Sequence, residues 1–366
     1  MISKRDSYRG CLLGLAVGDA MGYSVNTKTW PEIQEDYGPN GLLGYDLVNG
    51  YAEVTSHTQI ALFAANGLLL GLTRGQVLGR MAPYVRYVGL ALQEWAMSQR
   101  RYDQPRKINC WTFRIPELRR RHCTDTRMVE TLNRAQLGNL EDTFNKHDTP
   151  ASISTAIVAG LFANPDRMEN TEVGLLGAES IALTHGSPYA FLPGAIVAEL
   201  ISRCVYHPDR PLVELVEATL ENFEDRFSRE FPQTAEIAAL VRKALALTKK
   251  AEILPQQAME MLKCDTGAEV LAGAIYAAQV CHSDFDNAMV VAVNHSGRSA
   301  AVACLTGAIL GTRMGEGELP EFYMDGLEIR DVLEEMADDL LQGCPMTREN
   351  KLFDADWDQK YLHGEH

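Results

Sequence analysis

The stretch RGCLLGLAVGDAMG, Arg9–Gly22, is the part of the sequence that is most decisive for the fold. Its apolar residues recur at steps of three and four residues, as they do on the buried face of a helix. Gly10, Gly14 and Gly18 form a second stripe at four-residue steps. Because glycine has no side chain, another helix can approach this stripe very closely. We therefore predict a buried helix over Tyr8–Met21 in close contact with a second helix.

Helical periodicity continues through almost the whole chain, and strand patterns are hard to find. Thr58–Leu72 predicts another buried helix, and Thr55 and Ser56 before it are residues that commonly cap helix N-termini. Further helices are predicted over Gly75–Ser98, Ser152–Phe162, Thr171–Ala182, Pro188–Val205, Leu212–Phe223, Pro232–Thr248, Gly267–Val280, Phe285–Val293, Ala300–Met314 and Leu327–Gln342. The pattern indicates an all-α fold, with residues 1–366 in a single domain and an irregular excursion at residues 99–150.

The composition is that of a soluble globular protein with a large core, since 46% of the 366 residues are hydrophobic and 23% are charged. The formal net charge of −15 argues against a nucleic acid or an anionic membrane as the main partner, although a local patch can still bind a small anion. No apolar run reaches the roughly 18 residues that a membrane span needs, and the N-terminus has no cleavable signal pattern. The eight cysteines are scattered without a CxxC pair, which indicates buried thiols in a reducing cytoplasm.

A short polar turn, Asn294–Ala301, joins two apolar runs and contains no carboxylate. The backbone N–H groups around Asn294 and Gly297 are candidates for holding an anion, although both residues are also common turn formers. The planar guanidinium of Arg298 can bind a phosphate or carboxylate ligand through two hydrogen bonds, or it can pair with a protein carboxylate such as Asp19. The turn is therefore either a ligand-binding loop or a purely structural one.

Asp19 stands inside the apolar, glycine-striped helix, where a buried carboxylate needs hydrogen-bond partners. We expect a structural role, in which Asp19 fixes a neighbouring loop or pairs with Arg298. The alternative is that Asp19 assists catalysis.

The chain resembles the ADP-ribosylglycohydrolases, the ADP-ribosylhydrolase or dinitrogenase-reductase-activating glycohydrolase group. Arg9–Gly22 is similar to the opening helix of that family, whose pattern is close to G-x-x-x-G-x-x-x-G-D-A-x-G. Four further segments are similar to family motifs and occur in the family's order: Val54–Ile60, Ala182–Pro188, Thr266–Tyr276 and Ala292–Gly297. The resemblance implies an orthogonal bundle of α-helices with a two-magnesium site in a central cleft. It also implies hydrolysis of ADP-ribose from arginine, serine or related acceptors.

The positions that hold the two metals in the family carry other residues in this chain. The family's Thr-Asp-Asp triplet becomes Thr55–His57, and its Asp-x-Asp-Thr/Ser cluster becomes Arg298–Ala301. The position of a glutamate that assists catalysis in several members becomes Asn26. Magnesium prefers oxygen ligands, typically carboxylates and water. We therefore expect no magnesium and no other cofactor.

A middle loop of the family contains a glycine-rich G-x-x-M-R stretch, which corresponds here to Asn145–Thr155. The glycines and the arginine are missing, so that backbone has lost the residues that favour close approach to a ligand. Recognition of ADP-ribose itself is therefore a weaker expectation than the fold.

His57 stands at a former aspartate position and is a candidate general base or transition-metal ligand. His185 and His295 lie in other family motifs and can in principle converge on His57. The alternative is that all three are hydrogen-bonded core or loop histidines without a shared ligand.

Three functions are open on this basis. The first is a pseudoenzyme that binds an ADP-ribose-like or other anionic ligand, or that acts in regulation with an ADP-ribosylation-related protein. The second is an active hydrolase of ADP-ribosyl or related N- or O-glycosidic bonds that uses His57 without metal, with acidic help from Asp19 or Asp148. The third is an interaction scaffold. The predicted catalytic residues are His57 and Asp19, and the predicted ligand-binding residues are Asn26, Thr55, Ser56, His57, Asn294, Ser296, Gly297, Arg298 and Ser299.

The tail Leu352–His366 contains Phe353, Trp357 and Tyr361. These aromatic residues predict that the tail either folds back onto the bundle or meets another subunit. The oligomeric state is left open.

Overall fold

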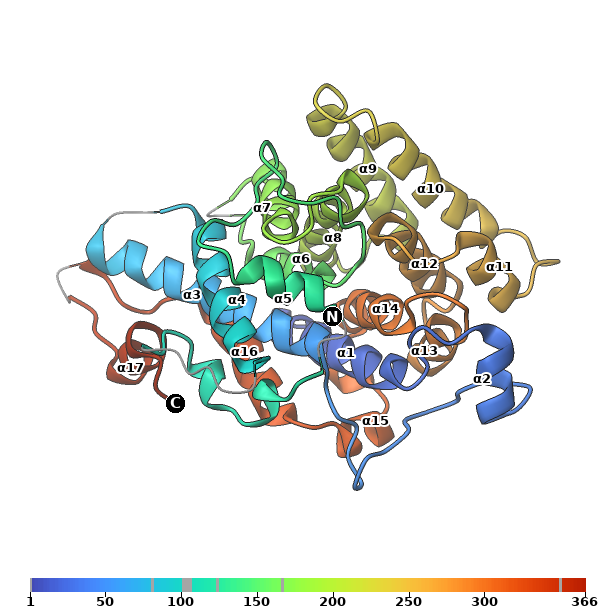
Figure 1. The fold of residues 1–366 in the computed structure, drawn as a ribbon, viewed down its shortest axis with the longest axis horizontal. Helices are drawn as coiled ribbons and strands as arrows, with labels where there is room; N and C mark the ends of the chain where they lie inside the picture. The colour runs from blue at the N-terminus through green and yellow to red at the C-terminus, as the bar shows by residue number, and fades with distance from the viewer. Residues whose placement is uncertain (1, 80–81, 101–106, 123–124, 166–167, 349–350) are drawn as a thin grey trace.

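The computed structural model describes residues 2–79, 82–100, 107–122, 125–165, 168–348 and 351–366. Within these ranges the chain forms seventeen α-helices and three short 3-10 helices (Figure 1). The described residues contain no β-strand, and only two isolated bridges, between Val48 and Tyr51 and between Ala52 and Leu327. The prediction of an all-α fold is confirmed.

Helices α1 (Lys4–Tyr23), α3 (Ser56–Leu78) and α14 (Ser299–Met314) position the candidate site. The remaining elements are α2 (Trp30–Tyr37), α4 (Tyr84–Ser98), η1 (Trp111–Arg114), η2 (Glu117–Arg119), α5 (Thr126–Leu132), α6 (Ile153–Phe162), α7 (Asn170–Ala182), α8 (Pro188–Tyr206), α9 (Leu212–Phe227), α10 (Thr234–Leu247), α11 (Pro255–Leu262), α12 (Gly267–Val280), α13 (Phe285–Val293), η3 (Glu316–Glu318), α15 (Glu321–Gly326), α16 (Arg330–Gln342) and α17 (Ala355–His363).

The glycine stripe of α1 packs against α14, and the two helices run antiparallel. A Cβ atom at Gly14 would overlap the carbonyl oxygen of Gly307, and one at Gly18 would overlap that of Ala303. The contact is reciprocal, because a Cβ atom at Gly307 would overlap the carbonyl oxygen of Gly14. Only residues with little or no side chain permit this approach. The predicted tight contact between the opening helix and a second helix is therefore present.

Two predicted helices are each interrupted. The helix predicted over Gly75–Ser98 is wrong, because Gly79 adopts a left-handed backbone with φ of +64° and ends α3. The helix predicted over Leu327–Gln342 is also wrong at its start, because Ile329 has φ of +53° and α16 begins after it. The other predicted helices are present with bounds that differ by a few residues. Periodicity missed the short helices α2, α5, α11, α15 and α17.

Helices α3 and α8 are both long and apolar enough to cross a membrane, with a mean hydropathy of 1.2 over an 18-residue window. The expectation that no apolar run reaches this length is therefore wrong by length and composition. However, 83% of each window is buried inside the fold. Burial of this extent is typical of core helices in a globular protein.

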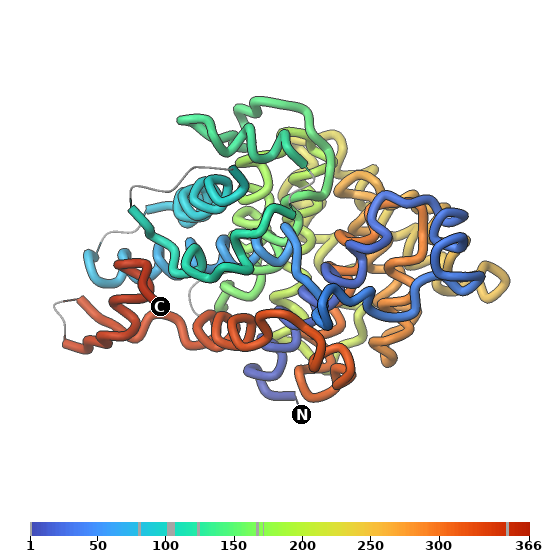
Figure 2. Tube along the Cα trace, turned by 60° about the horizontal axis from the view of Figure 1, so that its bottom comes forward, coloured from blue at the N-terminus to red at the C-terminus, as the bar shows by residue number. Residues whose placement is uncertain are grey.

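The C-terminal tail folds back onto the bundle. The Trp357 indole donates a hydrogen bond to the Thr73 hydroxyl of α3 at 2.9 Å, and the ring of His366 stacks on Trp111 at 4.6 Å between centroids. Figure 2 shows this tail beside the segment that contains η1 and η2. Tyr361 is completely buried. The aromatic side chains of Trp357 and Tyr361 are thus part of the hydrophobic core.

Residues 107–122 and 125–150 contain only the short elements η1, η2 and α5, connected by irregular backbone. This segment supplies part of the wall of the candidate site. The assignment of residues 1–366 to one domain stays a prediction.

Candidate functional site

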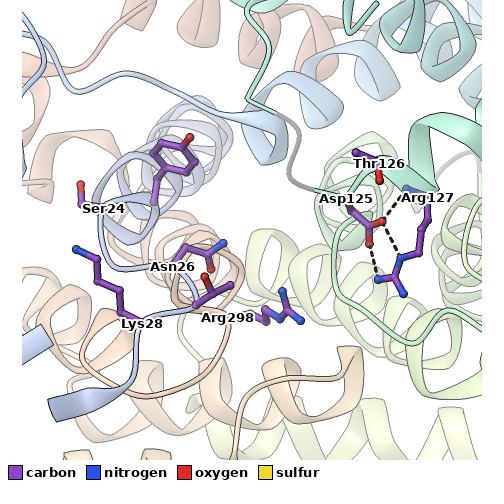
Figure 3. A pocket seen from close by; sticks show the side chains of 9 residues that line it. Ser24, Asn26, Lys28, Asp125, Thr126, Arg127 and Arg298 are labelled. Atoms are coloured by element: carbon purple, nitrogen blue, oxygen red, sulfur yellow. Dashed lines mark hydrogen bonds and ion pairs between the residues drawn. The ribbon is translucent and has the colours of Figure 1, made fainter. Parts of the chain in front are cut away.

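Two adjoining hollows lie where the loop after α1 meets α14 and α5. The outer pocket has a volume of about 660 Å³ and is lined by Tyr23, Ser24, Asn26, Thr27, Lys28, Asp125, Thr126, Arg127 and Arg298. The inner cavity measures about 40 Å³ and is lined by Asn26, His57, Asp125, Thr149, Pro150, Ala151, Arg298 and Ala301. The two share Asn26, Asp125 and Arg298. Figure 3 shows the outer pocket, with Asn26 and Arg298 on the side opposite Asp125–Arg127 and with the Lys28 side chain pointing away from Asp125–Arg127.

The inner cavity brings together three segments that are far apart in the sequence. Asn26 follows α1, His57 begins α3, and Arg298 and Ala301 begin α14. The Asn26 carboxamide oxygen also accepts a hydrogen bond from the Ala300 backbone N–H at 3.4 Å. The positions that differ from the family motifs therefore belong to one place in the fold.

Asp19 is completely buried and caps α3 from the neighbouring helix α1. Its carboxylate accepts hydrogen bonds from the backbone N–H of Thr55 at 2.8 Å and of Thr58 at 3.0 Å. It also accepts from both threonine hydroxyls. Thr55 is the N-cap residue, but its own side chain makes no capping bond. Asp19 therefore has the structural role of satisfying the first turn of α3.

The predicted alternative partner of Asp19, Arg298, pairs with another carboxylate. The Arg298 Nε donates to Asp265 Oδ1 at 2.7 Å, and the two side chains are 36% and 65% exposed. The backbone N–H of Arg298 donates to the Cys264 carbonyl at 2.8 Å. Within the described residues the terminal nitrogens of the guanidinium have no hydrogen-bond partner. Arg298 lines both the outer pocket and the inner cavity.

His57 is the second residue of α3 and is only 9% exposed. Its ring makes no hydrogen bond with any described residue, and Nδ1 is a buried atom without a partner. Burial lowers the pKa of His57, and the negative charge of Asp19 only partly opposes this effect. The imidazole is therefore neutral near pH 7.

Asp125 and Arg127 form the opposite wall and were not predicted as site residues. Asp125 is the N-cap residue of α5 and accepts hydrogen bonds from the Arg127 side chain, the Arg127 and Met128 backbone and the Thr149 hydroxyl. Burial opposes ionisation, but the hydrogen bonds from Arg127 and Thr149 hold the pKa of Asp125 below its ordinary value. An aspartate directly before Thr126-Arg127-Met128 is a typical N-cap pattern, which the sequence did contain.

Three predicted ligand-binding residues of the polar turn, Asn294, Ser296 and Gly297, line neither hollow. The Asn294 side chain holds the backbone of Leu42, accepting from its N–H at 2.8 Å and donating to its carbonyl at 2.9 Å. Ser296 donates to Glu260 Oε1 through its backbone and its hydroxyl. A Cβ atom at Gly297 would lie 2.5 Å from the carbonyl oxygens of Lys263 and Cys264. This tight packing explains the glycine without a ligand.

Ser299, Thr55 and Ser56 are likewise absent from the lining of both hollows. Ser299 is completely buried, and its hydroxyl donates to the His295 carbonyl at 3.5 Å. Ser56 is the first residue of α3 and is partly buried.

The three histidines of the family motifs have separate environments. His185 Nε2 lies 3.0 Å from the Thr149 hydroxyl, and because that hydroxyl donates to Asp125, the ring nitrogen is the donor. The His295 ring makes hydrogen bonds within its own turn. Its Nε2 bonds to the Ala292 carbonyl, and its Nδ1 accepts from the Gly297 backbone N–H. Burial lowers the pKa of both His185 and His295 to about 4. In the described part of the chain no three His, Cys, Asp or Glu residues are grouped to hold a metal ion.

Strained backbone flanks Arg298 on both sides. Thr27 in the outer pocket has φ of +68°, and Lys263 and Cys264 beside Asp265 have φ of +65° and +57°. Left-handed backbone is uncommon for residues other than glycine, and it is frequent at binding sites. Cys264 is directly linked to Arg298, because its carbonyl accepts the Arg298 backbone N–H at 2.8 Å.

The sequence model of the ADP-ribosylglycohydrolases matches residues 1–350. The chain belongs to the ADP-ribosylglycohydrolase family. One solved structure, described as an ADP-ribosylglycohydrolase-related protein complex, superimposes on it with a TM-score of 0.55 and 20% identity. That match covers 93% of this chain and 98% of the other, and it shows that the two share a fold. No curated protein matches the sequence.

The residues at the ADP-ribosylglycohydrolase metal positions do not fit two magnesium ions. From these positions the inner cavity offers an imidazole, a methyl group and a guanidinium, and the glutamate position adds the amide of Asn26. Its one carboxylate, Asp125, is engaged by Arg127 and Thr149. Magnesium takes oxygen ligands and gains most of its affinity from their negative charge, whereas Arg298 brings a positive charge to the site.

Proposed function

We propose that this member of the ADP-ribosylglycohydrolase family does not carry out metal-dependent hydrolysis and instead binds an ADP-ribose-like or other anionic ligand in the outer pocket. The observation that carries this proposal is the position of Arg298. Arg298 lines both the outer pocket and the inner cavity, and Asn26 and His57 from other substituted family positions line the inner cavity with it. A planar guanidinium recognises phosphate or carboxylate through paired hydrogen bonds.

Three cationic side chains are among the residues that line the outer pocket. Lys28 comes from the loop after α1, Arg127 from α5 and Arg298 from α14 (Figure 3). Each has a carboxylate partner, at 2.7 Å for Lys28 with Asp36 and for Arg298 with Asp265. Exposed ion pairs of this kind contribute only about 0.2 to 1 kcal/mol. Charge-assisted hydrogen bonds to a phosphate are about twice as strong as neutral ones, so a ligand can compete.

The volume of the outer pocket supports a small-molecule ligand. At about 660 Å³ it lies within the range of typical ligand pockets, roughly 300 to 1,000 Å³. An open pocket of this size also distinguishes the proposal from a pure scaffold, for which a closed and side-chain-filled cleft is expected.

A second candidate, hydrolysis through His57 without metal, is favoured by the buried imidazole that has no partner. A general base is normally oriented by a hydrogen bond to its second ring nitrogen. The two acids named as possible helpers are placed elsewhere: Asp19 is occupied by Thr55 and Thr58, and Asp148 lines a different pocket with Tyr189. Ligand binding is therefore the better supported function.

The proposal extends to cellular context. The seven described cysteines, at positions 11, 110, 204, 264, 281, 304 and 344, are free thiols. Free thiols and the net charge of −15 support a cytoplasmic protein that does not bind nucleic acid or membranes. Its partners are then the anionic ligand or an ADP-ribosylation-related protein.

The test is a binding titration with ADP-ribose on the wild type and on Arg298→Asp. We expect the reversed charge to weaken binding at least about tenfold, a loss of about 1.4 kcal/mol. Arg86→Asp, at an exposed position of α4 away from the pocket, is the matched control and should bind like the wild type. Unchanged affinity in Arg298→Asp, or turnover of ADP-ribosyl-arginine above background, would contradict the proposal.

A further inference from the structure

Three helix N-termini meet at the inner cavity. His57 lies in the first turn of α3, Ala301 lies in the first turn of α14, and Pro150 and Ala151 immediately precede the N-cap of α6. These helices have 23, 16 and 10 residues. The N-terminus of a helix carries about half a positive charge and backbone N–H groups without helical acceptors, which together favour anions. At the start of α3 the Asp19 carboxylate already accepts from Thr55 and Thr58, so the N-termini of α6 and α14 are the ones that remain to attract an anion.

An independent observation at the same cavity points to a bound group. His57 is 9% exposed and lines the cavity, yet its ring has no hydrogen-bond partner among the described residues. Buried polar groups nearly always have a partner. The neutral ring can donate one hydrogen bond to an acceptor placed in the cavity.

Arg298 is a further hydrogen-bond donor at the inner cavity, in addition to the helix N-termini and the His57 ring. Its Nε is used by Asp265, whereas its terminal nitrogens have no partner in the described part of the chain. A guanidinium can hold Asp265 on one edge and a second anion at its fork. The carboxylate that also lines the cavity, Asp125, is compensated by Arg127 at 3.2 Å and receives the Thr149 hydroxyl at 2.9 Å.

We propose that the inner cavity binds a terminal phosphate group, so that the ligand of this protein is a phosphomonoester. The inference rests on the proposed function, because it assigns the ligand class of the same site. The available donors are the His57 ring, the terminal nitrogens of Arg298 and the N-termini of α6 and α14, and a phosphomonoester has three terminal oxygens to accept from them.

The size of the inner cavity favours a terminal phosphate over an internal one. The inner cavity measures about 40 Å³ and adjoins the outer pocket of about 660 Å³, with which it shares Asn26, Asp125 and Arg298. A single phosphate in the small cavity can carry its sugar in the large pocket. The diphosphate of ADP-ribose carries bulky groups at both ends, whereas a sugar 5-phosphate carries one at a single end.

The experiment compares ribose 5-phosphate, inorganic phosphate and ADP-ribose by calorimetry on the full-length protein. We expect ribose 5-phosphate to bind at least about tenfold more tightly than ADP-ribose, and inorganic phosphate to compete with it. His57→Leu, which removes the ring donors, should weaken ribose 5-phosphate at least about tenfold and change ADP-ribose affinity by less than about twofold. His57→Gln, which keeps a donor, should retain most of the affinity, and melting curves check that each variant folds.

The outcomes separate this inference from the proposed function. If ADP-ribose binds in an Arg298-dependent way but ribose 5-phosphate binds no more tightly, the terminal-phosphate assignment is wrong and the proposed function stands. If His57→Leu folds and leaves the affinity for ribose 5-phosphate unchanged, the phosphate does not bind in the inner cavity. If none of the three probes binds the wild type, both proposals are wrong.

Discussion

The carboxylate of Asp19 in α1 accepts both the backbone N–H and the hydroxyl of Thr58 in α3, at 3.0 and 2.7 Å. Together with the two bonds from Thr55, these contacts join the glycine-striped helix to the helix that begins at the candidate site. The family motif G-D-A thus serves here to fix the start of α3, and with it the position of His57.

Asp19→Ala is expected to destabilise the fold strongly. The substitution removes four hydrogen bonds to a charged group and leaves the N–H groups of Thr55 and Thr58 buried without an acceptor. We expect a loss of about 3 to 5 kcal/mol in the free energy of unfolding, measured by urea titration at pH 7. Asp36→Ala, at an exposed ion pair with Lys28, should cost less than about 1 kcal/mol. Equal effects of the two variants would show that the cap is unimportant.

Gly14→Ala is expected to separate α1 from α14. The new methyl group would overlap the Gly307 backbone, which cannot move aside as a flexible side chain can. Overpacking of this kind costs about 1 to 3 kcal/mol, and contact with backbone places the expected cost at the upper end. Thermal unfolding provides the measurement. Gly44→Ala is the control, because a Cβ atom there meets nothing within 4 Å, and a control as damaging as Gly14→Ala would refute the packing argument.

Stability should fall below neutral pH because of two buried histidines. The folded state lowers the pKa of His185 and His295 to about 4, whereas the unfolded value is near 6.5. Below pH 6.5 the unfolded chain therefore binds protons that the folded chain does not, and stability decreases until about pH 4. The expected loss at pH 5 is about 2 kcal/mol for each histidine. His295→Gln should lower the slope of unfolding free energy against pH between 7 and 5, and an unchanged slope would contradict the assignment.

Asp265→Asn is expected to strengthen anion binding. Asp265 is 65% exposed and neutralises Arg298 from outside the pocket, so its charge competes with that of a ligand. Removing it should raise the affinity for ADP-ribose about two- to fivefold, in line with the small energies of exposed ion pairs. The same titration on Asp225→Asn, at an exposed position of α9 away from the pocket, shows whether the effect is specific to Arg298. A decrease in affinity would mean that Asp265 orients the guanidinium rather than competing for it.

The sequence predicted most of the helices because their apolar residues keep a strict helical period over ten or more residues. It did not predict the breaks at Gly79 and Ile329, since each is a single residue with left-handed backbone inside an otherwise continuous pattern. The short helices α2 and α5 span only eight and seven residues, which is too few for a period to stand out.

The convergence of Asn26, His57 and Arg298 followed from the family resemblance, and the structure brings these residues together. The partner of Arg298 did not follow, because the choice between Asp19 and Asp265 depends on how the segments pack. Asp125 and Arg127 were missed because they come from an irregular stretch without periodicity. The ligand-binding roles assigned to Asn294, Ser296, Gly297 and Ser299 stay predictions, and their bonds within the turn already account for these residue types.

The central claim is that an arginine has taken the place of metal ions as the anion-binding group. The most direct measurement is the dissociation constant of ADP-ribose for the wild type, obtained by calorimetry once with excess magnesium and once with a chelator. We predict binding in both conditions, with constants that agree within about twofold. Binding that appears only with magnesium, or that tightens tenfold or more when magnesium is added, would contradict the claim.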